Sequence, residues 1–332
     1  MDFIMKKISE NKQIEFNNLI NWFLSKKSAK KNLQSDYKWF LNTISKNIIF
    51  YYQDFKKLKI QNLKETIIKL KKYDNTFVKK FDINSKKKNE LLIREVRKLN
   101  NYLSFFIVHG SYATNDFIKN WSDFDSVVVI KDKVLKDYKL LNEFRIKMIA
   151  LENLLNKIDS FQHHGFLFMT EFDLNHYSSN FLPINVLEHS RVVTDKKILK
   201  IKYYRQKKFW VKKFLTLNNI FKKSFNQGFL EHHPLKGKYL HDNFKDLNTM
   251  YQMKYFLSLI MFIPCLYLEC IGRPTYKKYS FKKLYDLNLR IDYELLEKAS
   301  LIRSMSQNNF FKSNKIPKWL LKVLGKNYFK RA

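Results

Sequence analysis

One stretch of the sequence, HGSYATNDFIKNWSDFDSVVVI at residues 109–130, combines a tight turn with two closely spaced acids. Gly110 and Ser111 follow the apolar run FFIV, which is typical of a buried strand. Asp123 and Asp125 stand one residue apart and lead into SVVVI, a second run of this kind. The sequence therefore predicts a strand, a turn, a connecting loop and a second strand that begins at the acids.

Two carboxylates on one strand face predict a metal site. Side chains alternate faces along a strand, so Asp123 and Asp125 would point the same way, roughly 7 Å apart along the backbone, with Phe124 turned toward the core. Mg²⁺ or Mn²⁺ takes oxygen ligands, commonly one or two carboxylates together with substrate phosphates. Gly110 and Ser111 have the complementary role, because a glycine turn exposes backbone N–H groups to phosphate and a serine hydroxyl adds a donor.

This pairing of motifs resembles the nucleotidyltransferase superfamily related to DNA polymerase β, which includes antibiotic nucleotidyltransferases and tRNA-terminal transferases. The family pattern is an apolar strand, Gly-Ser, a connecting segment and an acid-x-acid strand; here it reads IVHGS, eleven residues, and DFD after a serine. The resemblance implies that Gly110 and Ser111 bind the phosphates of a nucleoside triphosphate. It also implies that Asp123 and Asp125 bind the catalytic metal while a nucleoside monophosphate passes to an acceptor hydroxyl or phosphate.

The family also uses a third carboxylate on a later strand. The sequence FLFMTEFDL at residues 166–174 is interpreted as that strand, with Glu171 and Asp173 on one of its faces. Glu171 is the preferred catalytic residue and metal ligand, because it lies closer to the body of the strand; Asp173, or no third acid, are the alternatives. His164, in the HHG that begins the strand, stands where some relatives carry the acid and departs from the pattern.

The flanking segments predict an α+β protein with a nucleotidyltransferase-type mixed sheet and flanking helices. Residues 1–83 are interpreted as an N-terminal segment of amphipathic helices. Residues 84–185 alternate strands and helices and form the expected nucleotidyltransferase domain. Residues 186–332, after the proline break in NFLP, are interpreted as an all-helical C-terminal domain of helix and loop. The expected helices cover residues 201–221, 250–271, 293–305 and 317–324.

The charge balance favours a small-molecule acceptor over nucleic acid. The chain has 63 Lys+Arg against 30 Asp+Glu, a formal net charge of +33, which by itself points to an anionic partner. Only nine of these cations are arginine, the residue best suited to forked phosphate recognition, and no concentrated basic stripe is visible along the sequence. No RNA-binding module is recognisable after the core. Nucleic acid is therefore the second choice.

The cysteine usage and hydropathy favour a cytoplasmic protein. Cys265 and Cys270 lie in one apolar segment, which argues against a disulfide framework and for reducing surroundings. That segment, residues 256–271, contains Pro264 and Glu269 and falls short of the roughly 20 residues of a membrane span, so we expect a buried helix. The beginning, MDFIMKKISENKQ, lacks the apolar core of a signal peptide.

Two other functions fit the same motifs. A catalytically silent nucleotide-binding or RNA-binding module could keep the fold without a third carboxylate. A metal-dependent glycosyltransferase also uses an acid-x-acid motif, but there the acids usually follow the apolar strand, whereas Asp123 and Asp125 precede it.

Overall fold

The computed structural model describes residues 2–25, 37–57, 63–74, 83–118, 122–158, 165–178, 182–203, 207–227 and 250–288. The chain divides into two compact units, one formed by Met1–Phe117 with Ser122–Arg205 and the other by Ile118–Trp121 with Gln206–Ala332. The three domains expected from the sequence, with boundaries at 83/84 and 185/186, differ from these two units and stay a prediction.

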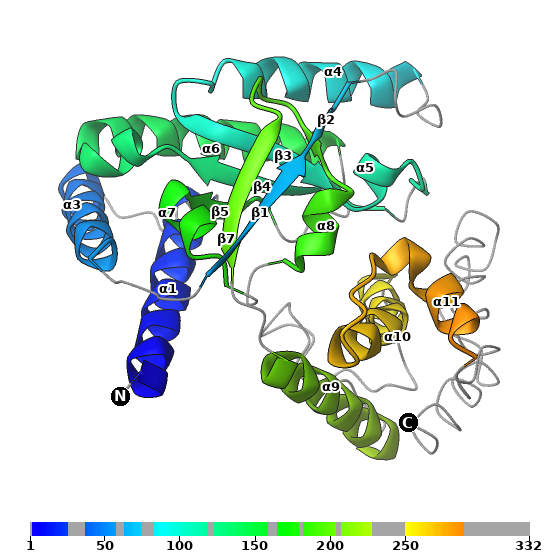
Figure 1. Cartoon of the computed structure of the whole chain (residues 1–332). Coiled ribbons are helices and arrows are strands. Elements are labelled where there is room, and N and C mark those ends of the chain that lie inside the picture. Colours follow the sequence, from blue (N-terminus) through cyan, green and yellow to red (C-terminus); the bar gives the residue numbers. More distant parts are fainter. Residues whose placement is uncertain are drawn as a thin grey trace. The chain divides into compact units, whose positions relative to one another are not determined.

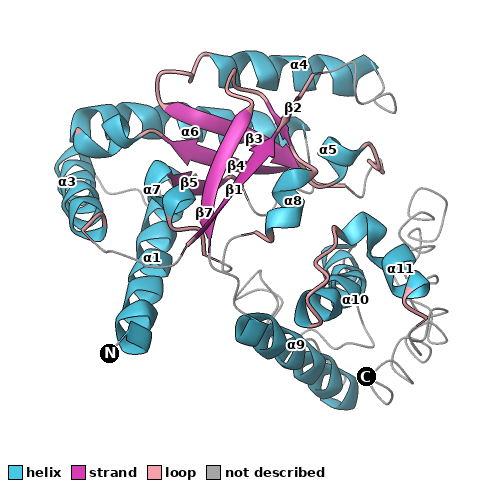
Figure 2. Ribbon diagram, viewed as in Figure 1, coloured by secondary structure: helices cyan, strands magenta, loops and turns pink. Residues whose placement is uncertain are grey.

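Among the described residues, a five-stranded mixed sheet forms the centre of the first unit (Figures 1 and 2). Its strands, in spatial order, are β2 (Lys71–Lys72), β6 (Arg191–Val192), β3 (Leu103–His109), β4 (Asp125–Ile130) and β5 (Leu167–Thr170). Strand β3 pairs antiparallel with β4 and β6, whereas β4 with β5 and β2 with β6 are parallel. A mixed sheet flanked by helices confirms the expected α+β class.

Helices cover one face of this sheet. They are α1 (Asp2–Leu24), α3 (Tyr37–Phe55), α4 (Ile83–Arg97) and α6 (Tyr138–Ile158), and a short 3-10 helix η1 (Asp132–Lys136) precedes α6. Phe106 of β3 and Val128 of β4 are buried in the same cluster as Phe16 of α1 and Phe144 of α6. Phe16 also stacks on Tyr52 of α3 at 5.4 Å between ring centroids, so aromatic packing joins the two N-terminal helices to the sheet.

The opposite face is covered by a two-stranded antiparallel ribbon, β1 (Lys64–Lys69) with β7 (Ile198–Tyr203), and by the short helices α7 (Glu171–Asn175) and α8 (Ile184–Glu188). Ile107 of β3 and Val127 of β4 are buried there with Ile68 of β1 and Leu199 of β7. Figure 1 shows the ribbon crossing in front of the sheet. Since neighbouring strand residues alternate faces, each strand contributes to both layers.

Two expectations about secondary structure are wrong at this ribbon. Strand β1 lies in the segment that was expected to be helical, and β6 and β7 lie in a stretch expected to be helix and loop. Residues 198–203, ILKIKY, alternate exposed and buried positions, which is the period of a strand. Helix α9 begins only at Lys207, after the expected start at residue 201.

The strand expected over residues 166–174 is also wrong beyond Thr170. Strand β5 ends there and α7 begins at Glu171 with a capping box. The Asp173 backbone N–H donates to Thr170 Oγ1 (3.2 Å), and the Thr170 N–H donates to Asp173 Oδ2 (2.7 Å). The sequence TEFD has the spacing typical of this cap, which favours a helix start over a continuing strand.

Asp173 connects this helix start to the N-terminal helix. Its side chain is fully buried and accepts hydrogen bonds from Gln13 (2.7 Å) and Asn17 (3.3 Å) of α1 as well as from Thr170. Burial raises the pKa of Asp173, although these donors oppose the rise. The role of Asp173 in this position is to join α1, β5 and α7.

The second unit is helical in the residues that the structure describes. Its helices are α9 (Lys207–Gln227), α10 (Met250–Cys270) and α11 (Lys277–Asp286). Cys265 of α10 is buried, and burial raises the pKa of its thiol to about 11. No helix in the described part of the chain combines the length and apolar character needed to cross a membrane. The helices expected over 293–305 and 317–324 lie outside the described residues.

We expect Asp173→Ala to lower the free energy of unfolding by about 3 kcal/mol or more. The substitution leaves buried donors of Gln13, Asn17 and Thr170 without their acceptor, and each unmet buried group costs about 1–3 kcal/mol. Urea denaturation followed by circular dichroism measures the change. Glu90→Ala, at an exposed position of α4, is the matched control and should unfold like the parent. Equal stability of the two variants would contradict the joining role of Asp173.

Candidate active site

The Gly110 turn directly follows β3. Gly110 has φ 67° and ψ −151°, a backbone conformation that essentially only glycine adopts. It is followed by the single-turn helix α5 (Ser111–Thr114), in which the backbone N–H groups of Ala113 and Thr114 donate to the Gly110 carbonyl at 3.0 and 3.1 Å. The Thr114 hydroxyl donates to the same oxygen at 3.1 Å. The turn is therefore held in one shape, with Ser111 at its beginning.

The turn and the second acid touch each other. Asp125 is the first residue of β4 and pairs with His109, the last residue of β3. A Cβ atom placed on Gly110 would lie only 2.6 Å from Asp125 Oδ2. Glycine is thus required here twice, by its backbone angles and by the carboxylate packed against its Cα.

Asp123 lies two residues before Asp125 and shows the same degree of burial. Both side chains are half-buried, whereas Phe124 between them is 1% exposed and belongs to the helix-covered core cluster. Asp125 shares the strand parity of Val127, which faces the ribbon side of the sheet. Strand alternation directs Asp125 away from the core that holds Phe124, whereas Asp123 precedes β4, so a shared face for the two acids stays a prediction.

Arg191 connects the turn to the far edge of the sheet. It pairs with Val108 of β3 and with Lys71 of β2. Its guanidinium donates from Nε to the Ala113 carbonyl and from Nη1 to the Lys72 carbonyl, both at 3.1 Å. Burial lowers the pKa of Arg191, partly opposed by the nearby Asp74, but a guanidinium stays charged at neutral pH. Arg191 therefore places a fixed positive charge beside α5.

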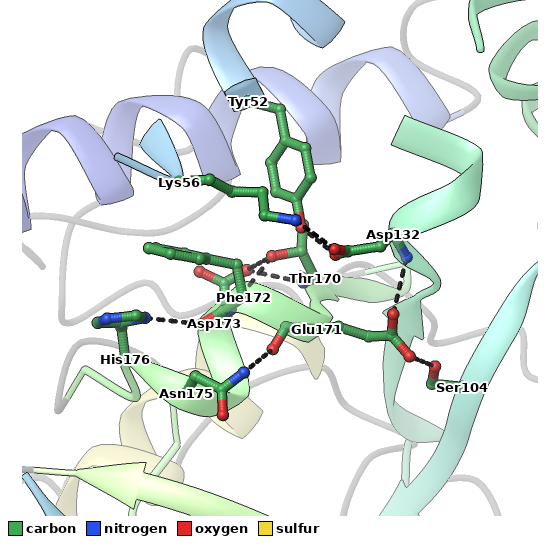
Figure 3. Close-up of polar contacts among 10 residues, drawn as sticks. All are labelled: Tyr52, Lys56, Ser104, Asp132, Thr170, Glu171, Phe172, Asp173, Asn175 and His176. Carbon is green, nitrogen blue, oxygen red and sulfur yellow. Dashed lines mark hydrogen bonds and ion pairs between the residues drawn. The ribbon is translucent and has the colours of Figure 1, made fainter. Parts of the chain in front are cut away.

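Glu171 does not meet the other two acids. Parallel pairing sets Ile130 of β4 level with Thr170 of β5, and Asp125 lies five residues before Ile130, roughly 17 Å at about 3.3 Å per residue. Glu171 instead accepts hydrogen bonds from the Ser104 hydroxyl and from the Asp132 backbone N–H (2.8 Å), as Figure 3 shows. The expectation that Glu171 shares a metal with Asp123 and Asp125 is therefore wrong, because the pairing of β4 with β5 places Glu171 at the opposite end of β4.

The polar groups around Glu171 join elements of the fold. Asp132 of η1 accepts hydrogen bonds from Tyr52 of α3 and from Lys56 directly after that helix (Figure 3). Burial alone would raise the pKa of Asp132, but the Lys56 and Tyr52 hydrogen bonds and the charge of Lys56 outweigh it and lower the pKa. Asp173, the alternative third acid, lies in this same region and is fully buried. Both alternatives for the third carboxylate therefore belong to the opposite end of β4.

The strand position beside Asp125 carries no acid. Val127 of β4 pairs with Leu167 of β5. Two residues earlier on each strand, Gly165 lies level with Asp125. His163 and His164 lie outside the described residues. Within the described part of the chain, no group of three or more His, Cys, Asp or Glu side chains is arranged to hold a metal ion. Asp123 and Asp125 therefore stay the predicted metal ligands.

Comparison with known families assigns this region to a class. Residues 90–212 match the family model described as a nucleotidyltransferase domain. The match contains the Gly110 turn, both acids, Arg191 and strand β7. The chain therefore carries a domain of the nucleotidyltransferase superfamily, as its motifs indicated. No curated protein and no solved structure matches the chain.

Sequence reasoning did not find Arg191. The residue stands in HSRVV, where nothing in the local pattern marks it as a site residue. Its position depends on the pairing of β6 with β3, two segments about 80 residues apart, and that pairing is invisible without coordinates. The one available signal is that Arg191 is an arginine directly before two valines in a chain whose cations are mostly lysine.

We expect Gly110→Ala to reduce the free energy of unfolding by about 2 kcal/mol or more. The new Cβ meets Asp125 Oδ2 at 2.6 Å, and the backbone angles by themselves cost about 1–3 kcal/mol for a non-glycine residue. Gly165→Ala is the matched control: its φ is 68°, but its nearest neighbour is the flexible end of Glu152 at 3.2 Å. Chemical denaturation of both variants separates the contact from the backbone strain.

A double-mutant cycle isolates the Gly110–Asp125 contact. In an Asp125→Ala background the carboxylate is gone, so Gly110→Ala should cost at least about 1 kcal/mol less than in the parent. Additive effects would show that Gly110 is required for its backbone angles alone.

Arg191→Met is expected to loosen the turn. Methionine retains the apolar stem but loses both hydrogen bonds, to the Ala113 and Lys72 carbonyls, and a hydrogen bond from a charged donor contributes about 1.5–3 kcal/mol. Hydrogen exchange of the Ala113 and Thr114 amides should therefore become faster relative to amides in α6. Unchanged protection of these two amides would exclude Arg191 as a support of the turn.

Proposed function

We propose that the first unit transfers a nucleoside monophosphate from a nucleoside triphosphate to an acceptor hydroxyl or phosphate in a divalent-metal-dependent reaction. The observation that carries the proposal is the contact between Gly110 and Asp125 inside a nucleotidyltransferase domain. It brings a phosphate-binding turn and a carboxylate pair to one place. The acceptor favoured by the sequence is a small molecule.

The residues present fit Mg²⁺ or Mn²⁺. Asp125 begins β4 and Asp123 lies two residues before it, so they offer two half-buried carboxylates close together in the chain, and a hard cation of this kind completes its coordination with substrate phosphates and water. When bound, the metal would neutralise charge on the phosphates during in-line displacement. A Cα within contact of Asp125 Oδ2 lets phosphate oxygens at the turn approach the same carboxylate.

The chain's own groups position the triphosphate. The Ala113 and Thr114 amides donate to the Gly110 carbonyl, so the backbone N–H groups of the Gly110 turn keep one direction. We propose that these groups and the Ser111 hydroxyl donate to phosphate oxygens. Arg191 holds the other end of α5, so the donors keep their direction before substrate arrives.

The alternatives differ in how well they agree with the domain match. A glycosyltransferase is set aside, because the acids lie within a nucleotidyltransferase domain and precede their strand. A catalytically silent nucleotide-binding module of the same fold remains the second candidate, because the described residues place no third carboxylate beside Asp125. Cys265 and Cys270 both lie in the apolar helix α10, which favours the reducing, cytoplasmic setting that we propose.

Asp125→Asn is expected to reduce nucleotidyl transfer by several orders of magnitude while the protein still folds. The substitution preserves shape but removes a charge that would bind the metal, and positioning and charge neutralisation supply almost all of the rate enhancement in phosphoryl transfer. Single-turnover transfer from labelled triphosphates, with Mg²⁺ and a metabolite extract as acceptor, measures the loss. Mg²⁺- and nucleotide-dependent thermal stabilisation should decline together with the rate.

Glu171→Gln is the matched control, because it removes an acid that lies far from Asp125 in the sheet. Because Glu171 lies at the opposite end of β4, this variant should lose stability but keep Mg²⁺-dependent turnover once folded. Parent-like turnover in Asp125→Asn would overturn the metal role of that residue. Nucleotide binding without turnover in the parent protein would favour the silent module.

A further inference from the structure

Pairing of β1 with β7 gathers lysines from two segments about 130 residues apart. The segments KETIIKLKK (residues 64–72) and DKKILKIK (residues 195–202) are adjacent in space because Lys64 pairs with Tyr203 and Lys69 with Ile198. We call their exposed cations the basic ribbon: Lys64, Lys69, Lys71, Lys72, Lys196, Lys197, Lys200 and Lys202. The linear sequence shows two ordinary lysine-containing stretches, whereas the fold makes them one surface.

The register fixes how the outward face of this ribbon is arranged. Glu65 lies opposite Lys202, Ile67 opposite Lys200, and Lys69 opposite Ile198. Lys69 and Lys200 are therefore diagonal neighbours, about 7–8 Å apart between Cα atoms, and Lys202 follows Lys200 by two residues, about 6.6 Å along the same strand. This arrangement makes a row of cations at a near-regular spacing.

The lysine content of the ribbon exceeds what the chain's composition supplies. The two segments hold eight lysines against two acids, Glu65 and Asp195, whereas the whole chain has 63 cations against 30 acids. The ratio of cations to acids is four to one in the two segments against about two to one in the whole chain, so the segments are about twice as rich in cations relative to acids. The expectation of no concentrated basic stripe was made on the linear sequence, and strand pairing builds such a surface.

The ribbon lysines contrast with the ion-paired cations of α4. On α4, Arg94 and Lys98 form ion pairs with Glu95. Among the residues that the structure describes, no lysine of the basic ribbon takes part in an ion pair; Lys196 lies over the Phe105 ring, 6.0 Å from its centroid. Clustered like charges repel each other, and a bound polyanion would relieve that repulsion.

Two exposed isoleucines lie among these cations. Ile67 and Ile198 are each 55% exposed and occupy the other diagonal of the same face. The outward face of the paired strands thus presents Lys, Ile and Glu, and none of the Arg, Asn or Gln side chains that read base edges in the DNA major groove. Such a face suits recognition of backbone and shape without sequence readout.

We propose that the basic ribbon docks the sugar-phosphate backbone of double-stranded RNA. Duplex RNA offers a wide, shallow minor groove bordered by phosphates, and proteins bind it mainly through shape, 2′-hydroxyl and phosphate contacts. The row formed by Lys69, Lys200 and Lys202 contacts the phosphates, and Ile67 and Ile198 face the sugars. This docking is separate from nucleotidyl transfer and does not depend on Asp123 or Asp125.

The test is equilibrium binding of a labelled RNA duplex of about 20 base pairs to the full chain across a range of salt concentrations. In the variant Lys69→Gln/Lys200→Gln/Lys202→Gln, binding should weaken for every duplex sequence. The slope of log affinity against log salt should become shallower by about 1 for each lysine removed. Replacing the same three lysines by arginine should retain binding.

The matched control is Lys87→Gln/Lys133→Gln/Lys139→Gln, which removes the same charge from exposed positions on α4, η1 and α6. Equal loss of affinity in both triple variants would overturn the proposal in favour of a net-charge effect. Preference for the DNA duplex of the same sequence, or for anionic phospholipid vesicles over RNA, would overturn it as well. Asp125→Asn should bind RNA like the parent, so loss of catalysis and loss of docking are distinguishable.

Discussion

The packing of the Asp125 carboxylate against the Gly110 Cα is the contact on which the candidate site depends. Antiparallel pairing of His109 with Asp125 brings the end of β3 and the beginning of β4 together, and a side chain at position 110 would occupy the space of the carboxylate. The short distance between the phosphate-binding turn and the acid follows directly. The ends of β3 and β4 and the glycine between them are held together by this contact.

Strand alternation extends this constraint to both layers of the first unit. Val127 follows Asp125 by two residues and is buried under the ribbon, whereas Phe124 and Val128 are buried under the helices. A shift of β4 by one residue would turn the Asp125 carboxylate toward the helical core, and the cost of burying a charge opposes this shift. The buried valines of β4 thus fix the direction of Asp125. The same strand register therefore sets both the packing of the sheet and the geometry of the site.

The sequence predicted what is local and missed what depends on pairing. Gly110, Ser111, Asp123 and Asp125 were found because a turn and a strand leave short-range patterns. Glu171 was misplaced because FLFMTEFDL was interpreted as one strand, although the capping box from Thr170 to Asp173 marks a helix start. Arg191 and the basic ribbon could not be predicted, since each depends on a strand pairing between segments about 80 to 130 residues apart.

One short path of backbone joins the ribbon to the turn. Strand β1 continues through Leu70 into β2, the Lys72 carbonyl accepts a hydrogen bond from Arg191, and Arg191 also donates to the Ala113 carbonyl in α5. The Leu70 N–H donates to the Lys197 carbonyl at 2.7 Å, which ties β7 to the same path. A duplex held on the ribbon would therefore act on strands that support the phosphate-binding turn. Under the proposal, docking and transfer use separate side chains, and the backbone hydrogen bonds of Arg191 and Leu70 are the support that the two surfaces share.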